Sequence, residues 1–218
     1  MFDRGPILPP DPESLDVLHD REYRVRAFKA GDDELLIRGA VRDQKPPGLY
    51  VPDDPDPLTI HHMQVDLRVA FPSPEIVGAD VVFESHPHDS CPRIVDHYHH
   101  LVGLSITRGF THRVRELFGG PRGCTHTTAL LQAMAPVAVQ CFWSMRPPTE
   151  RVELDANQRE AMWRMNIGSC HVWAPDGEYV AAFEGGKEPE LPVFLRRRLA
   201  ERGLDVGAGW PARRTADP

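Results

Sequence analysis

Two consecutive runs decide the fold of this chain: LTIHHMQVDLRVA at Leu58–Ala70 and IVGADVVFES at Ile76–Ser85. The first run is predicted to be a β-strand. The second run is rich in valine and isoleucine, which favour strands. The connection between them, residues 71–75, holds two prolines and is typical of a turn. We therefore expect two adjacent antiparallel strands.

Two further strands are predicted before this pair. Residues 23–28 alternate, residues 35–41 are largely apolar, and a Gly-Asp-Asp turn at residues 31–33 lies between them. The proline-rich segment at residues 43–57 predicts a loop. Because strands that are consecutive in sequence usually pair, the four strands predict an antiparallel β-meander.

After residue 90 the apolar residues recur at helical spacing, and Ser90 suits an N-cap. Phe110–Phe118 and Thr125–Met145 are predicted helices, and Pro136 inside the second favours a kink or a break. The predicted class is α+β, an antiparallel β-meander packed against several helices, with a C-terminal hairpin plus helix. The C-terminal predictions are a helix at residues 155–166, a hairpin of residues 170–174 and 178–183, and a helix at residues 191–202.

Composition limits the classes of function. The length of 218 residues predicts one domain over residues 21–204, with a flexible arm at 1–20 and a disordered tail at 205–218. A net charge of −7 without a basic stripe argues against a nucleic-acid partner. No apolar run approaches the roughly 18 residues of a membrane span. Four cysteines and no apolar leader indicate a cytoplasmic protein with reduced thiols.

Histidine and cysteine residues gather in one part of the sequence. Nine of the eleven histidines lie between His61 and His126, together with Cys91 and Cys124. Cys124 directly precedes the longest predicted helix, where the helix dipole favours an anion and lowers a thiol pKa. His126 lies in the same first turn. Such a pair either converges on a metal ion or forms a thiolate–imidazolium pair.

Cys91 also begins a predicted helix, which makes it the preferred partner of Cys124. His61 and His62 lie on a strand, where neighbouring side chains face opposite ways, so only one of them can face a shared site. We favour His62 because it lies closer to the strand centre. His88 and Asp89, which precede Cys91, are the nearest candidates for a general base. The predicted metal is zinc or iron, and its predicted ligands are Cys91, Cys124, His126 and one of His61 or His62.

The run Leu101-Val-Gly-Leu and the Gly-Gly-x-x-Gly-Cys-Thr-His motif at residues 119–126 resemble a bacterial family of domains of unknown function. The resemblance covers about residues 36–174 and departs at Thr127, where Leu is more usual. The family label implies no activity. The shared features also include Asp43, His62-Met63, Cys91-Pro92 and Cys170-His171.

The order of elements over residues 58–145 also resembles the NifU-like iron–sulfur scaffold fold. The resemblance implies that Cys91 matches the middle scaffold cysteine and that Cys124 and His126 stand where the later His-Cys pair stands. His61 or His62 would occupy the place of the first cysteine. An imidazole there, and Cys-Thr-His in place of adjacent His-Cys, favour zinc or iron with an open coordination position over a cluster.

Three functional hypotheses follow. The first is a metal-dependent, cytoplasmic enzyme of small-molecule catabolism, of hydrolase or lyase type, acting on a small molecule that can be hydrophobic or aromatic. A metal-free variant uses Cys124 as nucleophile and His126 as base. The second is a non-catalytic metal or iron–sulfur carrier, and the third is a purely structural site. A homo-oligomer is compatible with each.

Overall fold

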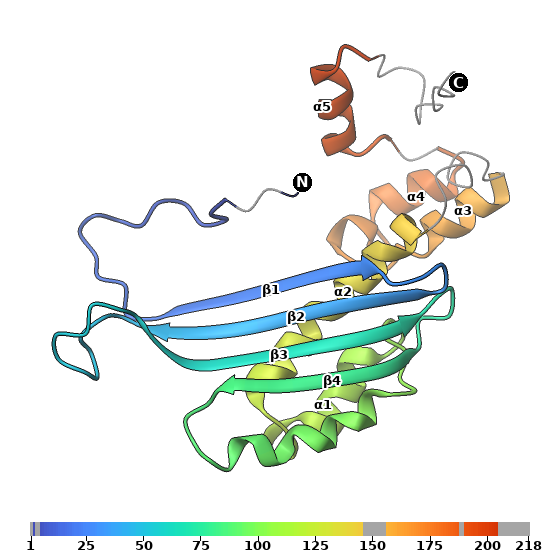
Figure 1. Cartoon of the computed structure of the whole chain (residues 1–218). Coiled ribbons are helices and arrows are strands. Elements are labelled where there is room, and N and C mark those ends of the chain that lie inside the picture. Colours follow the sequence, from blue (N-terminus) through green and yellow to red (C-terminus); the bar gives the residue numbers. More distant parts are fainter. Residues whose placement is uncertain (1, 3–4, 146–155, 188–189, 205–218) are drawn as a thin grey trace, which may run out of the picture. The chain divides into compact units, whose positions relative to one another are not determined.

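The computed structural model describes residues 2, 5–145, 156–187 and 190–204 (Figure 1). The chain divides into two compact units, Met1–Met145 and Arg146–Pro218. The predicted tail at residues 205–218 lies outside the described residues. Before the first strand, residues 5–18 are exposed and irregular.

The first unit is built on a four-stranded antiparallel sheet in the order β1-β2-β3-β4, which confirms the predicted meander (Figure 1). β3 and β4 have the predicted bounds, whereas β1 and β2 are longer than predicted. In particular, β2 continues through Asp43 to Lys45, into the segment that was predicted to be a loop. The bounds are β1 Asp20–Lys29, β2 Glu34–Lys45, β3 Leu58–Ala70 and β4 Ile76–Ser85.

Alternation gives the sheet one buried and one open face. On β2 the odd-numbered residues from Leu35 to Asp43 are buried, and on β3 the odd-numbered residues from Met63 to Val69 are buried. Their even-numbered neighbours are partly or fully exposed. An antiparallel sheet covered on one side produces this pattern. A residue's parity therefore decides whether it faces the helices or the solvent.

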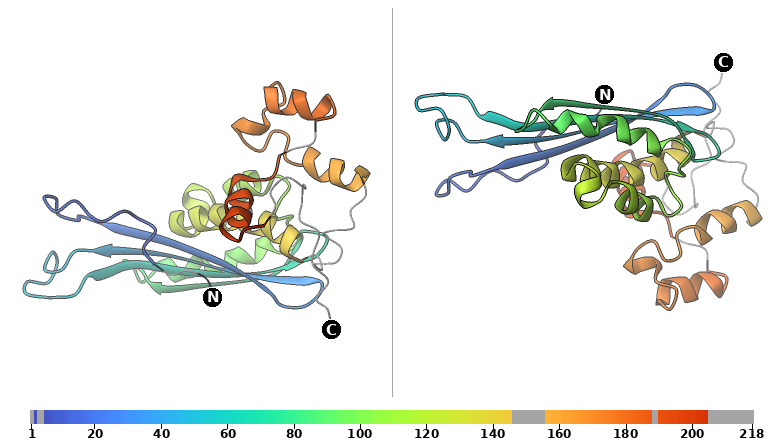
Figure 2. Two further views of the ribbon diagram at one scale, coloured as in Figure 1. Left: turned by 90° about the horizontal axis from the view of Figure 1, so that it is seen from above. Right: turned by 90° about the horizontal axis from the view of Figure 1, so that it is seen from below.

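The helices of this unit cover one face of the sheet (Figure 2). Leu130, Leu131 and Met134 of α2 are fully buried, and Gly39 of β2 leaves room for the side chains of Leu130 and Met134. Pro136 does not interrupt α2, which runs over the predicted residues. The bounds are η1 Cys91–Leu101, α1 Phe110–Phe118, η2 Gly120–Arg122 and α2 Thr125–Met145, with η1 a 3₁₀-helix.

The second unit is helical in its described part. The predicted hairpin of residues 170–174 and 178–183 is wrong, since both segments are helical. Tyr179 and Phe183 are four residues apart, so on a helix they share a face, and both rings contact Trp173. The bounds are α3 Ala156–Arg164, η3 His171–Trp173, α4 Glu178–Glu184 and α5 Val193–Glu201. In the described ranges, no helix combines the length and apolar character needed to cross a membrane.

Candidate metal centre

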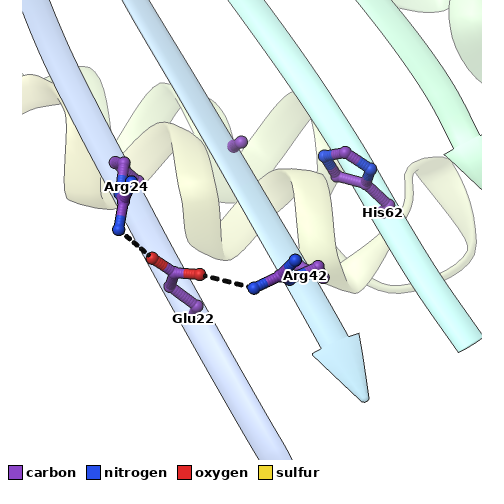
Figure 3. Close-up of a pocket in the computed structure, with 5 residues that line it drawn as sticks. Glu22, Arg24, Arg42 and His62 are labelled. Atoms are coloured by element: carbon purple, nitrogen blue, oxygen red, sulfur yellow. Dashed lines mark hydrogen bonds and ion pairs between the residues drawn. The ribbon is translucent and has the colours of Figure 1, made fainter. Parts of the chain in front are cut away.

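Two rows of polar side chains cross the sheet at one end, one on each face. The register pairs Arg21 with Asp43 and Asp43 with His61, so these three residues lie side by side on the helix-covered face. The next residues, Glu22, Arg42 and His62, form the corresponding row on the open face (Figure 3). There the Glu22 carboxylate forms ion pairs with Arg24 and Arg42, and these three residues line a shallow hollow together with His62.

The first turn of α2 adds His126 to the covered row. Its Nε2 lies 3.1 Å from Asp43 Oδ2, and the Nδ1 of His61 lies at the same distance from the same oxygen. The two imidazole rings are stacked, with centroids 3.9 Å apart. A β-bulge interrupts the β2–β3 register directly after Asp43, and bulges commonly re-aim side chains beside functional sites.

Asp43 is the centre of this group. Its side chain is only 1% exposed, and Arg21 donates to both oxygens, from Nε to Oδ1 and from Nη2 to Oδ2, each at 2.6 Å. Burial on its own would raise the pKa of Asp43, but the hydrogen bonds and charge of Arg21, helped by His126 and His19, hold that pKa well below its usual range. The carboxylate is therefore charged at neutral pH.

The remaining acceptor capacity of Asp43 is small. A carboxylate offers about four lone-pair sites. Arg21 uses two of them, and the Nε2 of His19, 3.4 Å from Oδ1, faces a third. A single site is left on Oδ2, and both His61 and His126 point at it. One cation bound by Oδ2 and the two imidazole nitrogens would satisfy all three atoms at once.

The ligand atoms of Asp43, His61 and His126 all lie within 4.8 Å of one another, so this buried group can hold a metal ion. Burial, followed by the neighbouring His61, lowers the pKa of His126. Neutral imidazole is the form that binds metal ions. The lowered pKa values of His126 and Asp43 thus favour the forms in which these two residues bind a metal ion, and Nδ1 of His61 lies beside them.

Cys124 lies on the other side of His126. Its Sγ is 3.7 Å from Nδ1 of the imidazole, so His126 is placed between the sulfur and the Asp43 carboxylate. The backbone N–H of Cys124 donates to the hydroxyl of Tyr98 at 2.9 Å. Tyr98 is 1% exposed, and burial raises the pKa of its hydroxyl. A tyrosine from η1 therefore accepts a hydrogen bond where α2 begins.

The structure brings together His61, His126 and Cys124 of the predicted site, but it places the others elsewhere. The preference for His62 does not hold, because its even parity turns it to the open face. Cys91 begins η1, and its thiol is not among the ligand atoms grouped in the described part of the chain. His88 and Asp89 are exposed in the β4–η1 loop. Cys91 was predicted because it begins a helix, and His88 and Asp89 were predicted because they precede Cys91 in sequence. Neither argument establishes that these residues lie close to Cys124 in space.

Sequence reasoning missed Asp43, Arg21 and His19 as members of the site. Asp43 was placed in a proline-rich loop, and His19 had no partner in sequence. The parity of β2 could have found Asp43, since it continues the buried series of Leu35, Ile37 and Val41. The same alternation on β3 indicates that His61, and not His62, faces the helices, because His61 is odd-numbered like the buried residues Met63 and Val65.

Comparison with known proteins places the chain in a family. Residues 19–140 match the family described as Protein of unknown function (DUF2889), and this match spans more than half of the chain. The chain belongs to this family. The matched segment begins at His19 and contains every residue of the Asp43 group, as well as Cys124. No curated protein and no solved structure matches the chain.

Proposed function

We propose that this member of the family is a metal-dependent enzyme, with zinc or iron held by Asp43, His61 and His126. The observation that carries the proposal is the crowding at Asp43 Oδ2, where two imidazole nitrogens at 3.1 Å compete for one remaining lone pair. Two histidines and one carboxylate are a recurrent ligand set of catalytic zinc and of non-haem iron.

The position of Arg21 supports a site with open coordination positions. Because its guanidinium engages both carboxylate oxygens, Asp43 can offer a metal ion only one of them. Three protein ligands, each giving one atom, leave positions free for water and substrate. This arrangement is characteristic of catalytic sites, whereas structural zinc sites usually have four protein ligands.

The charge balance supports the same reading. The charge of Arg21 offsets that of Asp43, and the two imidazoles are neutral ligands, so a divalent ion would keep most of its own charge. Such an ion, when bound, polarises a carbonyl group or acidifies a bound water. We therefore favour hydrolase or lyase chemistry on a small molecule, in the cytoplasm, over a carrier role. An iron–sulfur cluster is less favoured, since clusters are held mainly by thiolates and the ligand group contains none.

Adjacent histidines on opposite faces give a matched test. Purified protein, stripped with a chelator, is titrated with Zn²⁺ and, anaerobically, with Fe²⁺. The wild type is expected to bind one ion, His61→Ala to bind it at least about tenfold more weakly, and His62→Ala to bind as the wild type does. Equal losses in the two variants, or a wild type that binds neither metal, would contradict the proposal. Hydrolysis of a panel of simple esters, lost with chelator and restored by the metal, would test catalysis.

One observation favours a second candidate, a metal-free thiolate enzyme. Cys124 Sγ, the imidazole of His126 and the carboxylate of Asp43 form a continuous series, with distances of 3.7 Å and 3.1 Å. A nucleophile, a base and an orienting carboxylate are arranged in this order in thiol hydrolases. Turnover that persists without metal and is abolished by Cys124→Ser would favour this candidate over the metal enzyme.

A further inference from the structure

The orientation of His126 restricts what Cys124 can do in the metal site. The ring presents Nε2 to Asp43 Oδ2 and Nδ1 to the sulfur of Cys124. A neutral imidazole carries one proton, so a metal ion on Nε2 requires the proton to be on Nδ1. That N–H then points at Cys124 Sγ, which is its hydrogen-bond acceptor.

We propose that Cys124 remains outside the coordination shell and acts as a positioning residue that fixes the tautomer and ring orientation of His126. This inference rests on the proposed metal function. It reverses the role that the sequence suggests, in which Cys124 is a metal ligand. Partners of this kind are common for metal-binding histidines, although a carboxylate or a carbonyl is the usual acceptor.

The grouping of atoms supports the assignment. Cys124 is half-buried, yet among the described residues its sulfur does not belong to the set of ligand atoms that lie within 4.8 Å of one another. The sulfur instead contacts the ring edge that faces away from the carboxylate. To become a ligand it would have to pass around the imidazole that separates it from Asp43.

The main chain of Cys124 is held in place, so a shift of the main chain cannot carry the sulfur toward Asp43. Its N–H donates to the buried Tyr98 hydroxyl, and its carbonyl accepts the N–H of Thr128 at 2.9 Å. Tyr98 is in turn stacked on Phe118, with ring centroids 4.9 Å apart. On the preceding side Gly123 is confined, because a Cβ there would lie 2.5 Å from the Phe118 carbonyl oxygen. Cys124 is therefore anchored at both peptide groups.

Substitutions at Cys124 separate the two roles through metal affinity. Cys124→Ala removes the acceptor and is expected to weaken Zn²⁺ binding about tenfold. Cys124→Ser retains an acceptor and is expected to bind Zn²⁺ nearly as the wild type does. Cys141→Ala, which removes a half-buried thiol from α2, is the control and is expected to have no effect on Zn²⁺ affinity. Circular dichroism confirms that each variant is folded.

Absorption of the Co²⁺-loaded protein provides a readout that a merely structural role would not change. A cobalt–thiolate bond produces a strong sulfur-to-metal charge-transfer band, which is expected to be absent from the wild type. A band that Cys124→Ser abolishes, or equal Zn²⁺ affinities of wild type and Cys124→Ala, would overturn the positioning role while leaving the metal site in place. A wild type that binds neither Zn²⁺ nor Co²⁺ would instead reject the proposed function, and this inference with it.

Discussion

The pair formed by Arg21 and Asp43 has unequal exposure, and this inequality predicts which partner is costlier to remove. The side chain of Arg21 is 40% exposed, whereas that of Asp43 is 1% exposed. In the metal-free protein, Arg21→Met leaves a buried carboxylate facing only imidazoles. Asp43→Asn leaves a guanidinium that can turn toward water and remain hydrated.

The expected magnitudes follow from this difference. Removing one partner of a buried ion pair costs about 3–5 kcal/mol, because it leaves an uncompensated buried charge. Arg21→Met should lower the free energy of unfolding by about 3 kcal/mol, at the low end of that range, because the imidazoles still donate to Asp43. Asp43→Asn should lower it by about 1–2 kcal/mol, the value of the lost charged hydrogen bonds to a half-exposed partner.

Urea unfolding in the presence of a chelator, at about pH 7.5 and about pH 5, measures both the ranking and its pH dependence. In the wild type the pKa of Asp43 is lowered. The stabilisation of the fold by the Asp43 carboxylate is therefore present above the unfolded-state pKa of about 4 and is lost as the pH falls through the acid range. In Arg21→Met, burial raises the pKa of Asp43 instead, so the folded carboxyl holds its proton more tightly. The deficit of this variant should therefore shrink toward about pH 5. An Asp43→Asn variant that is less stable than Arg21→Met, or a deficit that grows on acidification, would refute the reasoning.

Two further predictions concern the packing around α2. Tyr98→Phe leaves the N–H of Cys124 without its acceptor and should cost about 1–3 kcal/mol in urea unfolding. Burial raises the pKa of Tyr98, so the stabilisation that its neutral hydroxyl provides is present below the unfolded-state pKa of about 10 and is lost as the pH rises above that value. The difference in free energy of unfolding between wild type and Tyr98→Phe should therefore become smaller at alkaline pH. Gly39→Ala places a Cβ 2.8 Å from Met134 Sδ and should cost about 1–3 kcal/mol. The loss should be smaller in a Met134→Ala background, and an equal loss in both backgrounds would show that Met134 is not the obstacle.

Most of the fold could be predicted from periodicity. β3 and β4 have the expected bounds because each is a run with strand-forming apolar residues, and clear turn residues lie between the two runs. α2 also has the expected bounds, since its propensity and burial outweigh the proline inside it. The C-terminal hairpin was wrong for a local reason. Tyr179, Val180 and Phe183 favour strands by composition, but their spacing matches a helix that packs against Trp173.

The candidate site was harder to predict, because it depends on pairing between strands that are distant in sequence. Two residues of the site, His126 and Cys124, were found from their position at the start of a helix, which is local information. Asp43 and His61 meet only because β2 extends beyond its apolar run and pairs with β3 in one particular register. A register shifted by one residue would place His62 beside Asp43 on the covered face, but it would also turn the buried residues Met63 and Val65 of β3 to the open face. Whether a residue of β2 or β3 is odd- or even-numbered thus decides whether it can join the site, and the alternating buried residues of both strands reveal this. Closeness to a cysteine or to the centre of a strand does not reveal it.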